Sequence, residues 1–164
     1  MNPPMKTQLL SASPADLSRA AILLRDGQVV GMPTETVYGL AADAKNPDAV
    51  ARIFEAKGRP ADNPLIVHIS TLETLDEIAA AVPPLALSLA EVFWPGPLTM
   101  IFKRRPEIPL VTTGGLETVG VRMPAHPAAR ELIRLAGTPL AAPSANRSGY
   151  PSPTSAAHVL ADMD

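Results

Sequence analysis

Proline is the residue that most constrains what this chain can fold into. Nineteen of the 164 residues are proline, and they are spread along the whole sequence. That share is about 12%, compared with roughly 5% in an average protein. A proline fixes φ and lacks an N–H group, so it suits the first turn of a helix or the end of a strand. We therefore expect prolines to mark the ends of helices and strands, with many rigid loops between them.

The composition narrows the class of protein. With 46% hydrophobic and 18% charged residues, the chain is typical of a globular domain. It contains no cysteine, which excludes disulfide scaffolds, cysteine-ligated metals and thiol nucleophiles and fits a reducing cytoplasm. A net charge of −2 argues against a general nucleic-acid-binding surface. Prolines at positions 83 and 84 interrupt the best apolar stretch, so we expect a cytoplasmic protein without a membrane segment.

Local signals predict helices and strands in irregular alternation. Helices are expected at residues 14–26, 47–57, 71–81, 84–93 and 127–135, and after the Thr154-Ser155 cap. Strands are expected at residues 29–32, 65–69, 98–102, 118–123 and 140–142. Because two of these strands follow each other directly, the pattern predicts an α/β (α+β) fold with a mixed, open, twisted sheet and helices packed on it. No repeat or flexible linker divides residues 1–164, which indicates a single domain.

Three of the predicted strands end in proline and are followed by polar or small residues. These junctions are Met32-Pro33-Thr34-Glu35-Thr36, Met123-Pro124-Ala125-His126 and Ala142-Pro143-Ser144-Ala145-Asn146. In open α/β folds, ligands bind beyond the carboxyl ends of strands, so these junctions could form one polar wall. The simpler alternative is that proline ends each strand and the hydroxyl groups cap the following turn.

Four cationic or titratable side chains are candidates for a ligand site. Lys57 and Arg59 flank a glycine at a predicted helix end, where they suit either the helix dipole or a polyphosphate. Arg122 lies within a strand and would need an anion, which could be a ligand carboxylate, a phosphate or an internal acidic residue. His68 lies in another apolar strand, where a structural histidine is the more common case. No metal-ligand spacing, protein nucleophile or standard nucleotide-binding glycine motif is present.

Longer motifs contain most of these residues. In order, they are Pro33-Thr34-Glu35-Thr36-Val37-Tyr38-Gly39-Leu40, Lys57-Gly58-Arg59-Pro60, Asn63-Pro64-Leu65-Ile66-Val67-His68, Trp94-Pro95-Gly96-Pro97-Leu98-Thr99, Val121-Arg122-Met123-Pro124 and Pro143-Ser144-Ala145-Asn146. Across about residues 17 to 160, the chain resembles the YrdC-type threonylcarbamoyl-AMP synthases. The resemblance implies a YrdC-like fold around a concave, cationic cleft. It also implies synthesis of L-threonylcarbamoyl-adenylate from L-threonine, bicarbonate and ATP, for the N6-threonylcarbamoyladenosine modification of tRNA.

The resemblance also implies a set of site residues. Those expected to hold threonine are Thr34, Thr36, His68 and Arg122, with Arg122 on the carboxylate. Those expected to contact ATP are Lys57, Arg59, Asn63, Thr118, Ser144, Asn146 and Ser152, of which Lys57 and Arg59 are the candidate catalytic residues. Mg²⁺ would bridge the ATP phosphates, because the sequence offers no carboxylate cage for it. Nucleotidyl transfer of this kind needs positioning and charge neutralisation more than a protein nucleophile.

Two other functions remain open at this stage. One is an RNA-binding or translation-linked module of the same fold, including a module that binds double-stranded RNA, which would need a local basic patch despite the net charge of −2. The other is the carbamoyl-transfer domain of hydrogenase maturation factors, which normally accompanies cysteine-rich segments. Members of the YrdC-type synthase family continue beyond the point that corresponds to Asp164, so the resemblance implies a domain that is incomplete at its C-terminus. Partner proteins in tRNA modification, or tRNA itself, are further expected partners.

Overall fold

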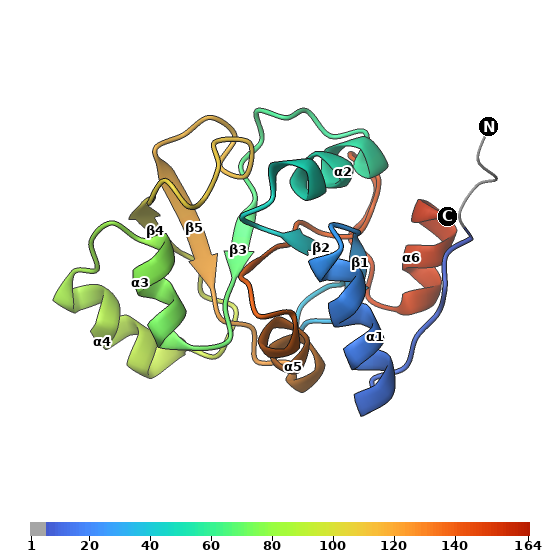
Figure 1. Ribbon diagram of the computed structural model, residues 1–164, viewed down its shortest axis with the longest axis horizontal. Coiled ribbons are helices and arrows are strands. Elements are labelled where there is room, and N and C mark those ends of the chain that lie inside the picture. Colours follow the sequence, from blue (N-terminus) through green and yellow to red (C-terminus); the bar gives the residue numbers. More distant parts are fainter. Residues whose placement is uncertain (1–5) are drawn as a thin grey trace.

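The computed structural model describes residues 6–164. Its helices are α1 (Pro14–Arg25), α2 (Pro47–Lys57), the 3-10 helix η1 (Leu72–Thr74), α3 (Leu75–Ile78), α4 (Pro84–Phe93), α5 (Pro127–Ala136) and α6 (Ala156–Met163). Its strands are β1 (Val30–Met32), β2 (Gly39–Asp43), β3 (Ile66–His68), β4 (Met100–Lys103), β5 (Thr118–Arg122) and β6 (Leu140–Ala141). Figure 1 shows the strands in the middle of the molecule, with helices around them. No helix within residues 6–164 is long and apolar enough to cross a membrane.

Proline begins several of the helices, as the sequence predicts. α1, α2, α4 and α5 each carry a proline in their first turn. The side chains of Ser13 and Asn46 cap α1 and α2 by accepting hydrogen bonds from the first free N–H groups. Gly58 ends α2 in the left-handed conformation, with φ of 58°, which residues other than glycine rarely adopt. These boundaries confirm the interpretation of proline as a marker of helix starts.

The sheet is mixed, which confirms the predicted fold class. Its strand order is β1-β2-β6-β3-β5-β4. Only β3 and β5 pair in parallel among the neighbours, and the other neighbouring pairs are antiparallel. β1, β6 and β4 therefore run in one direction, and β2, β3 and β5 in the other.

The three proline-ended strands do not all end at the same edge of the sheet. β1 and β6 end at the same edge of the sheet, where Gly39 forms a bridge with Ser144. β5 runs the opposite way, so Met123 and Pro124 leave the sheet at the other edge. The segment after β1 nevertheless reaches this end of β5, where the carboxylate of Glu35 accepts from the N–H of Ala125, so the first and third junctions are in contact.

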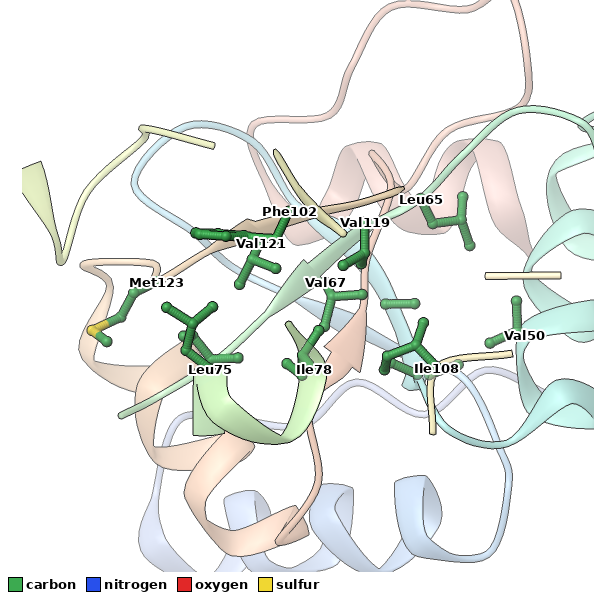
Figure 2. Close-up of a cluster of buried hydrophobic side chains, with 14 of the residues drawn as sticks. Val50, Leu65, Val67, Leu75, Ile78, Phe102, Ile108, Val119, Val121 and Met123 are labelled. Carbon is green, nitrogen blue, oxygen red and sulfur yellow. The ribbon is translucent and has the colours of Figure 1, made fainter. Parts of the chain in front are cut away.

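Hydrophobic side chains cover the two faces of the sheet unequally. On one face, residues such as Val67, Val119 and Val121 pack against α2, α3 and the segment around Ile108, and Figure 2 shows this cluster. On the other face, α1 and α5 cover only the part formed by β1, β2 and β6. Over β3, β5 and β4 that second face stays open, with Ile101 73% exposed and Ile66 38% exposed.

Two elements differ from the sequence prediction. β2 was not expected, because Leu40, Ala41 and Ala42 are all buried and so lack the alternating pattern of a half-exposed strand. The helix predicted at residues 71–81 is instead η1 followed by the short α3, which ends at Ile78. Ala79 forms a bridge with Arg104, and the N–H of Ala80 donates to Lys103. Pairing with the end of β4 therefore replaces the last helical turn.

Candidate functional site

The open part of the second sheet face brings several of the candidate residues together. In the strand register, His68 pairs with Arg122, and Ile66 pairs with Gly120. Side chains two residues apart on a strand lie on the same face, so these four positions share one surface. Gly120 adds no side chain to it, and a Cβ there would lie 3.3 Å from Cγ2 of Thr99. The result is a floor between β3 and β5 on which a ligand could lie.

Arg122 lies at one end of this floor, and protein groups already hold its guanidinium. Nε donates to the carbonyl oxygen of Gly96 at 3.1 Å, and Nη1 donates to Oγ1 of Thr36 at 3.3 Å. Nη2 donates to the carboxylate of Glu35, which forms an ion pair with it. The internal acidic partner that the sequence left open is therefore present. An arginine this buried needs a compensating charge even without a ligand.

His68 lies beside Arg122 and is almost completely buried. Its Nδ1 lies 3.1 Å from the carbonyl oxygen of Ile66, which can only accept, so Nδ1 carries the proton. Burial and, to a lesser extent, the charge of Arg122 lower the pKa of His68 to about 4, against weaker opposing effects that include Glu35. The imidazole is therefore neutral at physiological pH and adds no charge to this end of the floor.

Lys57 defines a second group of candidates, at the edge where β6 ends. Its Nζ donates to the backbone carbonyl oxygen of Asn146 at 2.5 Å and to that of Ser144. The N–H of Ser148 donates in turn to the carbonyl oxygen of Lys57. Burial lowers the pKa of Lys57 to about 8, and the charge of Arg59 contributes to this shift against the opposing charge of Asp162. These contacts join the Lys57-Gly58-Arg59 and Ser144-Ala145-Asn146 motifs.

Two buried polar atoms in this second group have no hydrogen-bond partner within residues 6–164. They are Nε of Arg59, a donor, and Oδ1 of Asn146, an acceptor. The Arg59 guanidinium also donates from Nη2 to the carbonyl oxygen of Pro64 at 3.2 Å, and burial lowers its pKa. The amide nitrogen of Asn146 donates to the carbonyl oxygens of Arg147 and Tyr150. A buried polar group without a hydrogen-bond partner raises the free energy of the folded state. These two atoms therefore suit a ligand that both accepts and donates hydrogen bonds.

The remaining ATP candidates lie around the same end of the strands. Asn63 is exposed just before β3 and Thr118 is exposed at the start of β5, which is parallel to β3. Ser144 follows β6, and the N–H of Ala142, just after β6, donates to the carbonyl oxygen of Ile66. Thr118 and Arg122 are four residues apart on one strand, which corresponds to roughly 13 Å. Asn63 and Thr118 thus lie at one end of the surface between β3 and β5, and His68 and Arg122 lie at the other end.

Ser152 lies farther out than the other candidates. It is exposed and lines a cavity of about 320 Å³ between residues 151–154 and α6, together with His158 and Asp162. Another cavity, of about 580 Å³, lies between residues 6–12, α1, β1 and α6, and no predicted site residue lines it. The concave, cationic cleft that the resemblance implies stays a prediction.

The segment between β1 and β2 links the two ends of the surface. Thr34 and Thr36 lie in it, with their Oγ1 atoms 3.0 Å apart, and Oγ1 of Thr34 donates to the carbonyl oxygen of Val37 at 2.6 Å. At its far end, the carbonyl oxygen of Tyr38 accepts from the N–H of Ala145. Glu35, in the same segment, was absent from the predicted site. The need of the buried Arg122 for a countercharge was the sequence signal that could have found it.

Comparison with known proteins gives consistent matches. The profile of the Sua5/YciO/YrdC family, described as "Telomere recombination", matches residues 22–164. The threonylcarbamoyl-AMP synthase of Bacillus subtilis is 55% identical over 96% of this chain and 46% of its own length. That of Halorhodospira halophila is 38% identical over 89% of this chain and 76% of its own length. The crystal structure of Pyrococcus abyssi Sua5 complexed with L-threonine superimposes with a TM-score of 0.90 at 54% identity, over 94% of this chain and 45% of that one. The chain thus spans less than half the length of the Bacillus and Pyrococcus proteins.

Proposed function

The chain belongs to the Sua5/YciO/YrdC family, and from this premise we propose that it forms L-threonylcarbamoyl-adenylate from L-threonine, bicarbonate and ATP, with release of pyrophosphate and water. The observation that supports this most is the placement of two candidate groups at opposite ends of one open sheet surface. His68 and Arg122 lie at one end, and Asn63, Thr118 and Ser144 lie around the other. This arrangement suits a reaction that joins an amino acid to a nucleotide.

The Arg122 end suits the carboxylate of an amino acid. A guanidinium can bind a carboxylate through two parallel N–H groups, and the neutral His68 beside it offers no repulsion to a substrate ammonium. An amino acid bound there would direct its amine along the surface, toward the other end. In the proposed reaction, that amine takes up bicarbonate as a carbamate with loss of water, and a carbamate oxygen then attacks the α-phosphorus of ATP.

The opposite end suits the triphosphate and its leaving group. Arg59 presents a buried, unpartnered Nε beside Lys57, and both cations would neutralise charge that develops on pyrophosphate. Mg²⁺ bound to ATP would supply further charge neutralisation of the phosphates. Within residues 6–164 no cluster of three histidine or acidic side chains could hold a metal ion, so the phosphates themselves are its expected ligands. The proposal thus needs no protein nucleophile.

We also propose that this activity serves N6-threonylcarbamoyladenosine formation in tRNA, in the cytoplasm, with tRNA-modification proteins as partners. The support is the name of the relatives, threonylcarbamoyl-AMP synthase, because a carbamoyl-adenylate is an activated intermediate that an acceptor must consume. None of the described residues identifies the molecule that accepts the threonylcarbamoyl group.

The test is a pyrophosphate-release assay on the chain with L-threonine, bicarbonate and Mg-ATP. Release that requires both threonine and bicarbonate is expected, and Arg122→Ala should lose it while Arg134→Ala, an exposed control on α5, should keep it. Pyrophosphate release that is absent or independent of threonine would overturn the proposal. A salt-dependent shift of RNA without any such release would favour the RNA-binding alternative, and transfer from carbamoyl phosphate would favour the hydrogenase-maturation alternative.

A further inference from the structure

Glu35 holds a contact that none of the predicted roles explains. One of its carboxylate oxygens accepts from Nη2 of Arg122, and the other accepts from the backbone N–H of Ala125. The side chain of Glu35 is 25% exposed and that of Arg122 is 10% exposed, so the ion pair is largely shielded from water. Glu35 therefore connects the segment after β1 to the end of β5. Glu35 and Arg122 are 87 residues apart in the sequence.

The hydrogen bonds of Arg122 leave a specific pair of donors available. A guanidinium carries five N–H groups, one on Nε and two on each terminal nitrogen. Gly96 takes the Nε–H, Thr36 takes one N–H of Nη1, and Glu35 takes one N–H of Nη2. One N–H remains on each terminal nitrogen, and a carboxylate needs two N–H donors of one guanidinium for a bidentate contact.

We infer that Glu35 is a positioning residue that fixes the Arg122 guanidinium so that its two remaining N–H groups can receive a ligand carboxylate. The inference rests on the proposed function, in which that carboxylate belongs to the amino-acid substrate. Glu35 acts through Arg122, because its own two oxygens are both occupied by protein donors. It also supplies the countercharge that keeps a buried arginine stable before the ligand arrives.

The opposite role for Glu35 would be that of an internal competitor that must leave Arg122 before a ligand can bind. The contacts favour positioning for two reasons. The second oxygen of Glu35 is held by the N–H of Ala125, so departure would break two contacts together. Departure is also unnecessary, because Arg122 keeps one N–H on each terminal nitrogen while Glu35 is in place.

Glu35→Gln is the discriminating variant. Both partners of Glu35 are donors, so the amide of glutamine can satisfy only one of them and must turn its own N–H₂ toward the other. We expect the calorimetric Kd for L-threonine to rise roughly tenfold, and the KM for threonine to rise by the same factor with kcat changed by less than about twofold. Glu35→Asp, which keeps the charge, should restore part of the affinity. Glu77→Gln, which removes an exposed ion pair with Lys45, is the matched control and should bind threonine like the wild type.

Tighter threonine binding in Glu35→Gln would show that Glu35 is a competitor, and an unchanged Kd would show that it does not position Arg122. Either result overturns the inference.

A second measurement needs no substrate. The Nε–H signal of Arg122, assigned in a ¹H–¹⁵N spectrum by its loss in Arg122→Lys, should exchange with solvent at least about ten times faster in Glu35→Gln than in the wild type. Equal protection in both proteins would overturn the inference. If the wild type binds no threonine but Glu35→Gln still exchanges faster than the wild type, the proposed function is refuted and the positioning role is kept.

Discussion

The Nζ atom of Lys57 lies 2.5 Å from the backbone carbonyl oxygen of Asn146, and this contact joins the end of α2 to the segment after β6. The two residues are 89 positions apart in the sequence. Lys57 is 3% exposed, so backbone carbonyl groups take the place of water around its ammonium group. The motif that the sequence marks as a phosphate-binding candidate therefore also determines how the site is held together.

Lys57→Met should destabilise the fold, because methionine fills a similar volume but cannot donate to Asn146. An unpartnered carbonyl and the lost charge-assisted hydrogen bonds correspond to roughly 1–3 kcal/mol. Urea unfolding measures this difference. Lys45→Met, which removes an exposed ion pair with Glu77, is the control and should change the free energy of unfolding by less than about 0.5 kcal/mol. Equal effects from the two variants would contradict a structural role for Lys57.

The pKa of Lys57 gives stability and ligand binding opposite dependences on pH. Burial lowers this pKa from 10.5 to about 8, so between these values the folded state binds fewer protons than the unfolded state. The free energy of unfolding should therefore rise with pH across this window, by about 2 kcal/mol between pH 7 and pH 10 relative to Lys57→Met. Affinity for ATP should fall over the same window if the ammonium neutralises phosphate. A difference between the two proteins that stays constant with pH would contradict the lowered pKa.

His68 should make the protein sensitive to mild acid. Burial lowers its pKa from 6.5 to about 4, so the neutral form stabilises the fold and this stability is lost as the pH falls from 6.5 toward 4. The wild type should lose about 2 kcal/mol of stability between pH 7.5 and pH 5 relative to His68→Gln. Glutamine retains an N–H that can donate to the carbonyl oxygen of Ile66. Parallel urea titrations at the two pH values test this, and equal losses in both proteins would contradict it.

Arg59→Ala should weaken ATP binding by about tenfold or more, because a charge-assisted contact to phosphate contributes roughly 1.5–3 kcal/mol. The buried Nε of Arg59 has no partner within residues 6–164, so the variant breaks no hydrogen bond of the ligand-free protein at that nitrogen. Calorimetry with Mg-ATP measures the change. Arg19→Ala on α1 removes an exposed arginine in the same way and should leave ATP affinity unaltered. An Arg59→Ala protein with wild-type affinity would remove Arg59 from the site.

Local signals in the sequence predicted the parts of the fold that depend on neighbouring residues. Prolines 14, 47, 84 and 127 begin helices, and glycines 58 and 137 end them, because these residues restrict or permit backbone angles independently of context. β2 escaped prediction since it is buried on both faces, and the helix at residues 71–81 was too long because β4 pairs with its end.

The contacts within the candidate site could not be predicted in the same way. Glu35 and Arg122 are 87 residues apart, and their contact depends on the strand order of the sheet and on the path of the segment after β1, which local signals do not report. The sequence could state that a buried arginine needs an anion, but it could not choose between an internal and an external one. Motif resemblance did supply the names of the other candidates, because it draws on relatives whose chains have the same topology.

The variant Gly120→Ala tests whether ligands lie on the open sheet surface. Gly120 lies between Ile66 and Ile101 in the strand register, on the route from Thr118 to Arg122. In Gly120→Ala, the added Cβ would lie 3.3 Å from Cγ2 of Thr99 and 3.8 Å from Cγ1 of Ile66, so a small shift of the half-buried Thr99 can accommodate it. We expect a change in stability within about 1 kcal/mol. The raised floor should nevertheless increase the KM values for threonine and ATP, by roughly tenfold for whichever ligand lies directly above it.

Gly31→Ala is the matched control for this variant. It also adds a methyl group to a strand, but its Cβ would meet Cγ1 of Val159 at 3.6 Å, an ordinary contact in β1 and away from the candidate site. Its KM values should equal those of the wild type. If Gly120→Ala also leaves both KM values unchanged, the ligands do not lie on the surface between β3 and β5, and the two candidate groups at its ends cannot serve one reaction.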